Sequence, residues 1–406
     1  MGQGDCTIIE TNVGQADGLI IMIDCGSVSG VDDVYANNLR PTLNDIFADY
    51  PHVNGALRNT IDYLFLTHPD GDHYNMLTNE RLLLHFNVDE IYYGGPKSAY
   101  GVAKDHLPDI TMVQNYFNVS ARDRIIGTRN SIFKLWILSV NYPFDGRPKP
   151  AVLNANYNNF NYTSKSGNSN KNVRQVIDCN GCSLIILIQY GDDFRAMFTG
   201  DATDQQQEEL WRKTVLTELQ QRFDPVAEPI QFVNFQSKLF KMSHHGSVKS
   251  CNVLFTNRMV APEALIVSAG MKNGHPSNIA ISQIPTETSV DGSTHPCVLY
   301  MDNITEVVNL GKRKTEKRRN YENISLPEFV FTTQLEFISI DEYNNKKKLR
   351  VGDKNKYETG EKAYTTGLMM KGRNLTFEVE EDGTYQVQSE DDSRVTWLHN
   401  SNEYNG

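Results

Sequence analysis

The stretch YLFLTHPDGDHYNML, residues 63–77, places two histidines and two aspartates within six residues, directly after an apolar run. His68, Asp70, Asp72 and His73 can converge on one point in an extended or turn conformation, and Gly71 would permit the tight backbone that this requires. Nothing in the local sequence neutralises the two aspartates. A metal ion would do so, because imidazole and carboxylate groups are common ligands of divalent metals.

Three later segments repeat this placement of His or Asp after an apolar run. Asp201 follows one such run and precedes a polar helix, where alone it could equally be a helix cap. His244 and His245 lie in KMSHHGS, and His275 lies in SAGMKNGHPS. Since strand ends in layered α/β folds lie along one rim, the four segments together predict a shared metal site.

Strands alternating with helices must position these residues. The apolar patterns predict strands at 6–10, 18–24, 61–67, 183–190, 194–199, 239–243, 264–269 and 297–301. Helical patterns cover 74–86, 203–219 and the neighbourhood of 250–258. Residues 325–390 alternate like β-hairpins, one with a turn at Asp382-Gly383. We therefore expect an α/β fold with mostly strand layers, and a loop at 154–175, which is rich in Asn and Ser.

Composition bounds the class of protein. The net charge of −11 argues against a protein that coats nucleic acid, although not against an enzyme that contacts a few phosphates. The sequence has no run of eighteen apolar residues, so we expect no membrane helix. The first residues lack the features of a signal peptide, which favours a cytoplasmic location. Secretion stays open, because the N-terminus may be incomplete.

Six segments, taken in order, resemble the metallo-β-lactamase superfamily of dinuclear metallohydrolases. They are GQGD (2–5), IDCG (23–26), THPDGDH (67–73), NGCSLIILIQYGDDFRAMFTGDA (180–202), HHGS (244–247) and GHP (274–276). More narrowly, the chain is similar to the soluble hydrolase domain of ComEC competence proteins. The resemblance covers residues 1–305 and implies an αββα four-layer sandwich with a loop insertion at about 97–175. Residues 306–406 would be a β-rich C-terminal extension.

The resemblance also assigns roles to residues. The metal ligands would be His68, Asp70, Asp72, His73, Asp201 and His244, with Asp201 bridging two divalent ions. His245 is the alternative to His244. Zn²⁺ or Mn²⁺ would be the ions, and Asp70, which replaces the usual second histidine, shifts the preference toward Mn²⁺.

Several residues would act on substrate or support the site. Asp70 or Asp72 would orient a water molecule, and His275 would donate to a phosphoryl oxygen or the leaving group. Asn180 lies where other members of the superfamily carry a third histidine. Three further residues have two open interpretations. Asp5 and Asp24 support the loop that carries His68 or cap turns, and Lys241 contacts a phosphate or extends into solvent.

The expected activity is that of a phosphodiesterase or nuclease, which uses a metal-activated hydroxide on DNA, RNA or a nucleotide. One alternative is a hydrolase of a lactone, thioester or amide on the same fold. Another is a non-catalytic metal-binding partner protein. The sequence indicates no membrane interaction and identifies no protein partner.

Overall fold

The computed structural model describes part of the chain and divides it into two compact units. The N-terminal unit comprises Gly2–Leu187 and Phe198–Asn234, and the C-terminal unit comprises Ile188–Met197 and Phe235–Gly406, with Met1. The described residues are 5–27, 31–51, 58–108, 116–117, 120, 122–140, 180–223, 233–247, 250–268, 298–301, 330–332, 336–337, 368–369, 375–389 and 397–399.

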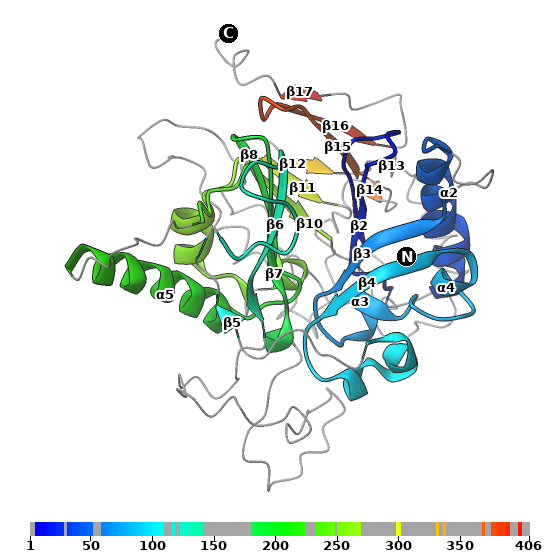
Figure 1. Cartoon of the computed structure of the whole chain (residues 1–406), viewed down its shortest axis with the longest axis horizontal. Helices are drawn as coiled ribbons and strands as arrows, with labels where there is room; N and C mark the ends of the chain where they lie inside the picture. The colour runs from blue at the N-terminus through cyan, green and yellow to red at the C-terminus, as the bar shows by residue number, and fades with distance from the viewer. Residues whose placement is uncertain are drawn as a thin grey trace, which may run out of the picture. The chain divides into compact units, whose positions relative to one another are not determined.

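A four-stranded sheet organises the start of the N-terminal unit (Figure 1). Its strands are β1 (Thr7–Glu10), β2 (Ile20–Ile23), β3 (Thr60–Leu66) and β4 (Asn87–Tyr93), side by side in chain order. β1 runs antiparallel to β2, whereas β2, β3 and β4 are parallel. The C-terminal ends of β2, β3 and β4 therefore share one edge with the N-terminal end of β1. The strands predicted at 6–10, 18–24 and 61–67 are confirmed.

Helices cover one face of this sheet. They are α1 (Val31–Val34), the π-helix η1 (Tyr35–Leu39), α2 (Arg40–Ala48), α3 (Gly71–Tyr74), α4 (Leu82–His85) and the 3-10 helix η2 (Lys97–His106). Leu43 and Phe47 of α2 belong to one buried apolar cluster with Met22 of β2 and with Leu64 and Leu66 of β3. Phe65 points to the opposite face and stacks on Tyr92 of β4, as the two-residue period of a strand requires.

The helix predicted over 74–86 is wrong. Two single-turn helices, α3 and α4, flank a turn-rich segment there instead. The reason is tertiary: Met76 N donates to Cys25 O (3.0 Å), which ties the chain after α3 to the segment after β2. The backbone N–H that would continue the helix is thereby used elsewhere.

The middle of the chain adds strands and one long helix. The strands are β5 (Tyr116–Phe117), β6 (Phe133–Val140), β7 (Ile185–Tyr190) and β8 (Phe194–Phe198), neighbours in the order β8-β7-β6-β5. The 3-10 helix η5 (Asn180–Cys182) precedes β7, and β7 and β8 contribute residues to both units. Helix α5 (Asp204–Phe223) follows β8, so the strand pair and the helix predicted here are confirmed.

The C-terminal unit contains the parallel strands β9 (Leu239–Lys241), β10 (Ala264–Val267), β11 (Val298–Met301) and β12 (Val330–Thr332), in the order β12-β11-β10-β9. The 3-10 helix η6 (Ser243–Gly246) follows β9, and the π-helix η8 (Phe255–Val260) stands near the helix expected at 250–258. The remaining strands are β13 (Glu336–Phe337), β14 (Leu368–Met369), β15 (Leu375–Val379), β16 (Tyr385–Ser389) and β17 (Trp397–His399).

The hairpin predicted around Asp382-Gly383 is confirmed. Val379 pairs with Tyr385 at the turn between β15 and β16, and Gly383 takes the left-handed φ of +80°. The hairpin packs within its own unit: Lys238 Nζ donates to Gly383 O (2.8 Å), and the Phe194 and Tyr385 rings meet edge to face. Within the described part of the chain, no helix is both long and apolar enough to cross a membrane.

Candidate metal centre

Polar residues from three strands meet at the shared edge of the four-stranded sheet. Asp24 follows β2, and Thr67 and His68 follow β3. Because β2 and β3 are parallel, with Ile23 opposite Phe65, these residues lie side by side. Asp5 reaches the same edge from the start of β1, and its N–H donates to Asp72 O (3.1 Å).

Asp24 accepts three hydrogen bonds at this edge. Thr67 N donates to Oδ1 (2.7 Å), Thr67 Oγ1 donates to Oδ2 (2.8 Å), and His73 Nδ1 lies 2.8 Å from the same Oδ2. Asp24 has a φ of 60°, a left-handed conformation that Asp tolerates better than most residues. The Asp24 carboxylate therefore ties the end of β3 to the first helix after it.

The two histidines of the opening stretch are fully buried next to each other. The rings of His68 and His73 lie 4.1 Å apart between centroids. His68 Nδ1 lies 3.1 Å from Thr67 Oγ1, which is also 3.4 Å from His73 Nδ1. Both Nδ1 atoms thus face the Asp24 and Thr67 pair, and both Nε2 atoms point to the other side.

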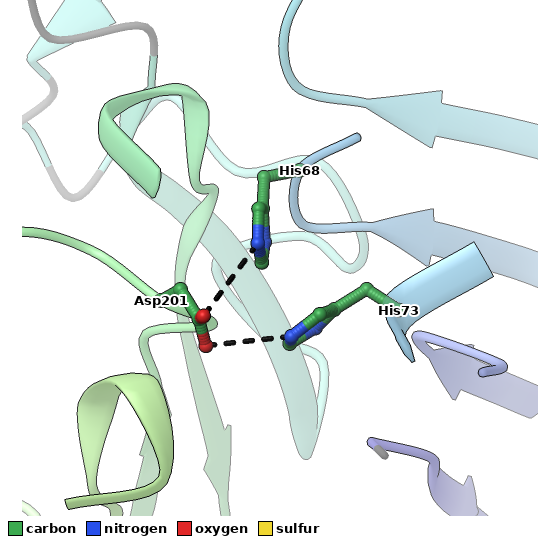
Figure 2. Close-up of side chains that lie close together, drawn as sticks. All are labelled: His68, His73 and Asp201. Atoms are coloured by element: carbon green, nitrogen blue, oxygen red, sulfur yellow. Dashed lines mark ion pairs between the residues drawn. The ribbon is translucent and has the colours of Figure 1, made fainter. Parts of the chain in front are cut away.

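Asp201 occupies that other side. Figure 2 shows its carboxylate beside the two rings, with one oxygen directed at each Nε2: His73 Nε2 lies 3.3 Å from Oδ1, and His68 Nε2 lies 3.7 Å from Oδ2. Asp201 is 2% exposed. Its N–H donates to Ser183 Oγ (3.1 Å), which joins the loop after β8 to the segment before β7.

Gly200 allows the loop with Asp201 to approach the end of β3. It has a φ of +50°, and a Cβ there would lie 2.6 Å from both Cβ and Oγ1 of Thr67. Gly71 differs, because its φ is ordinary and a Cβ would meet only Asn75 Nδ2, at 3.9 Å. The tight backbone expected to require Gly71 is therefore not found there; the close approach occurs at Gly200.

The pKa values of the two histidines are shifted in opposite directions. Burial, and then the charge of His73, lower the pKa of His68 to about 3, against the pull of Asp201, Asp70 and Asp72. Burial also opposes protonation of His73, but Asp24 and Asp201 outweigh it and raise the pKa of His73 well above 6.5. Burial raises the pKa of Asp24, and His73 counteracts this.

The residues at this edge fit a divalent metal ion. His68, His73 and Asp201 each offer a ligand atom, and these atoms lie within 4.8 Å of one another. Ligands of a tetrahedral zinc ion at ordinary bond lengths are roughly 3.4 Å apart, close to the spacings of 3.3 and 3.7 Å from Asp201. His68 Nε2 is buried and has no hydrogen-bond partner among the described residues, as expected of a lone pair kept for a metal. Asp5, Asp24 and His73 form a second such grouping.

The other predicted residues of the N-terminal unit surround this group. Asp70 is the N-cap of α3 and accepts from Gly71 N (3.1 Å), and Asp72 is half-buried on the same helix. Asp5 is buried, with Oδ2 3.7 Å from His73 Nδ1. Asn180 is buried in η5, and its carbonyl accepts from Ser183 N (3.1 Å).

The remaining predicted residues belong to the C-terminal unit or lie outside the described residues. His244 and His245 both have left-handed φ values, of 48° and 55°. His245 is buried, and its Nδ1 lies 2.5 Å from Ser268 O. Lys241 is only 7% exposed, which corrects the expectation of a strand lysine extending into solvent. His275 lies outside the described residues.

Sequence reasoning gave no supporting role to three polar residues near the centre, although Ser183 lies with Asn180 where the superfamily carries a third histidine. Thr67 contacts Asp24 and His68, Ser183 receives the N–H of Asp201, and Gln206 Nε2 donates to Ser183 O (2.8 Å) and to Ser139 Oγ (3.1 Å). Gln206 on a helix and hydroxyls at strand ends are too ordinary to stand out. The available signal was position, since Thr67 directly precedes His68.

Comparisons with known proteins give little further guidance. No family model and no curated protein matches the chain. Among solved structures, one match is a protein of Parabacteroides distasonis described as a "putative metal-dependent hydrolase". It is 12% identical, with 74% of this chain and 98% of that chain covered and a TM-score of 0.30. A likeness this low carries no weight for the fold or for the site.

Proposed function

We propose that the chain is a metal-dependent hydrolase whose centre is formed by His68, His73 and Asp201. The observation that carries this proposal is the pair of buried imidazoles with Nε2 directed at the two oxygens of one buried carboxylate (Figure 2). Placing three such groups together without a bound cation leaves a buried lone pair unused, which folded proteins rarely tolerate. A divalent metal ion bound there would polarise a substrate oxygen and lower the pKa of a water molecule from 15.7 toward about 7.

The chain's own residues have separate parts in this proposal. His68 and His73 present Nε2, and Asp201 contributes one or both oxygens. Asp24 and Thr67 hold the far sides of the imidazoles, an arrangement that orients ligands and raises their basicity. Asp70 and Asp72 lie close enough to act electrostatically on His68. They are the residues that we propose as ligands of a second ion.

A phosphodiester is the substrate class that we propose, in DNA, RNA or a nucleotide. Two considerations support it. The edge is rich in carboxylates, which are hard ligands suited to ions that also coordinate phosphate oxygens. The sequence also resembles the metallo-β-lactamase superfamily of dinuclear metallohydrolases. We propose its αββα sandwich for residues 1–305 on the same ground. The hydrolysis of a lactone, thioester or amide remains the alternative substrate class.

The test combines metal content with cleavage. The wild-type protein is incubated with single- and double-stranded DNA, RNA and cyclic nucleotides in the presence of Mn²⁺, Zn²⁺ or Mg²⁺. Asp201→Asn removes a ligand charge at nearly constant volume. Asp45→Asn makes the same change at an exposed position of α2 in the same unit and serves as the matched control.

We expect metal-dependent cleavage that Asp201→Asn lowers by more than about 100-fold and Asp45→Asn leaves unchanged. Metal binding without cleavage of any of these substrates would overturn the phosphodiester proposal, and lactone and thioester panels would follow. A folded wild-type protein that binds none of the three metals would overturn the metal centre itself.

A further inference from the structure

We propose that Thr67 is a positioning residue, whose hydroxyl fixes the tautomer of His68 and links both histidines to the single carboxylate of Asp24. This inference rests on the proposed metal centre for its purpose, although its structural content can be tested without metal. Thr67 lies between His68 and Asp24 and belongs to neither of the histidine and aspartate groupings at this edge.

The hydrogen-bond directions follow from the chemistry of the groups. An ionised carboxylate only accepts, so the Thr67 hydroxyl donates its one proton to Asp24 Oδ2, 2.8 Å away. The hydroxyl oxygen then has only lone pairs left for His68 Nδ1, 3.1 Å away. His68 Nδ1 must therefore carry the proton, and its Nε2 must be the bare nitrogen on the side of Asp201.

For His73 no intermediate hydroxyl is needed, because its Nδ1 contacts Asp24 Oδ2 directly. One carboxylate thus sets the orientation of both imidazoles, directly for His73 and through Thr67 for His68. The backbone of Thr67 is held as well: its N–H donates to Asp24 Oδ1, and its carbonyl accepts from Leu184 N (2.9 Å). Gly200 closes the remaining side, so the hydroxyl has little freedom to turn.

Removing the hydroxyl should reverse the tautomer of His68. Without Thr67 Oγ1, a proton on Nδ1 loses its acceptor, whereas a proton on Nε2 would face the Asp201 carboxylate at 3.7 Å. The bare nitrogen would then point away from the metal position. Thr67→Val keeps the shape of the side chain and removes the hydroxyl, and Thr67→Ser keeps the hydroxyl.

The experiment uses ¹⁵N-histidine labelling of the full, metal-free chain and long-range ¹H–¹⁵N correlation spectra near neutral pH. The His68 signals are assigned by their loss in His68→Gln. We expect an Nδ1–H tautomer in the wild type and in Thr67→Ser, and an Nε2–H tautomer in Thr67→Val. Thr217→Val, which removes a hydroxyl bonded within α5 (to Lys213 O), is the matched control and should leave His68 unchanged.

Affinity for Mn²⁺ or Zn²⁺, measured by chelator competition, is the second readout. We expect Thr67→Val to bind about 10- to 100-fold more weakly, with rescue in Thr67→Ser. An Nε2–H tautomer in the wild type would overturn the inference even if Thr67→Val failed to fold. Metal binding with an unchanged tautomer and affinity in Thr67→Val would overturn it while leaving the proposed function intact. An Nδ1–H tautomer in a protein that binds no metal would support the inference about Thr67 and overturn the proposed function.

Discussion

His73 and His68 are adjacent rings with opposite proton affinities, which has a consequence for metal capture. Asp24 and Asp201 raise the pKa of His73, so its imidazole keeps a second proton to higher pH than an ordinary histidine does. A metal ion must displace that proton from Nε2. His68, whose pKa is lowered to about 3, offers no such competition above acidic pH.

Metal affinity should therefore keep rising with pH beyond the range of an ordinary histidine. If the pKa of His73 were 6.5, the metal affinity would level off above pH 6.5. Because the pKa is raised, the affinity should continue to rise above pH 6.5, by about tenfold per pH unit. Isothermal titration with Mn²⁺ across this range, in buffers matched for ionisation heat, measures the slope. A curve that is already flat just above pH 6.5 would contradict the role assigned to Asp24 and Asp201.

At the residue scale, the sequence brings out the candidate ligands more readily than the residues that support them. His68, His73 and Asp201 were visible because charged and imidazole groups directly after apolar runs are unusual. Thr67 was not, since a threonine at the end of a strand has an ordinary explanation in strand propensity. Its importance comes from being opposite Asp24, a contact between residues 43 positions apart.

At the scale of helices and strands, loop glycines determine how closely the elements of the site approach one another. The loop after β8 reaches the end of β3 only because Gly200 has no side chain and takes a left-handed φ. Gly71, inside the histidine-rich segment, has room for a methyl group. The two positions provide a matched pair for substitution.

Gly200→Ala should destabilise the protein by about 2 kcal/mol or more, since alanine disfavours this φ and its Cβ would overlap Thr67. It should also weaken metal binding, because Asp201 would move. Gly71→Ala should stay within about 0.5 kcal/mol of the wild type. Urea unfolding of the metal-free proteins compares them; equal losses at both positions would mean that the loop after β8 is not held against Thr67.

The secondary structure was predicted correctly where the local sequence pattern determines the element. The prediction failed where tertiary contacts determine it. Helix α5 and the β15–β16 hairpin follow local periodicity and turn chemistry. The segment 74–86 has helical spacing, yet Met76 N bonds to Cys25 O across the chain and the helix breaks. No inspection of 74–86 alone would reveal that competing partner.

For the whole molecule, a preformed centre predicts ligand-linked stability. Metal binds the folded centre and not the scattered ligands of the unfolded chain, so an ion at 100 times its Kd should stabilise by about 2.7 kcal/mol. Thermal unfolding with and without Mn²⁺ measures this shift. Asp201→Asn should lose it and Asp45→Asn should keep it. A shift of the same size in Asp201→Asn would locate the ion elsewhere in the chain.

The positions of Asp24, Thr67 and Asp201 along the chain also order events during protein synthesis. Asp24, His68 and His73 belong to the first part of the 406-residue chain, whereas Asp201 comes near its midpoint. The first sheet and the hydrogen bonds of Asp24 can form as soon as β4 has left the ribosome, because the strand pairing and the contacts of Asp24 with Thr67 and His73 lie within the first hundred residues. Asp201, the third residue of the candidate centre, arrives only after β8 has been made. A nascent chain shorter than this would hold two oriented imidazoles without their carboxylate, so the proposed metal site is complete only once Asp201 has been made.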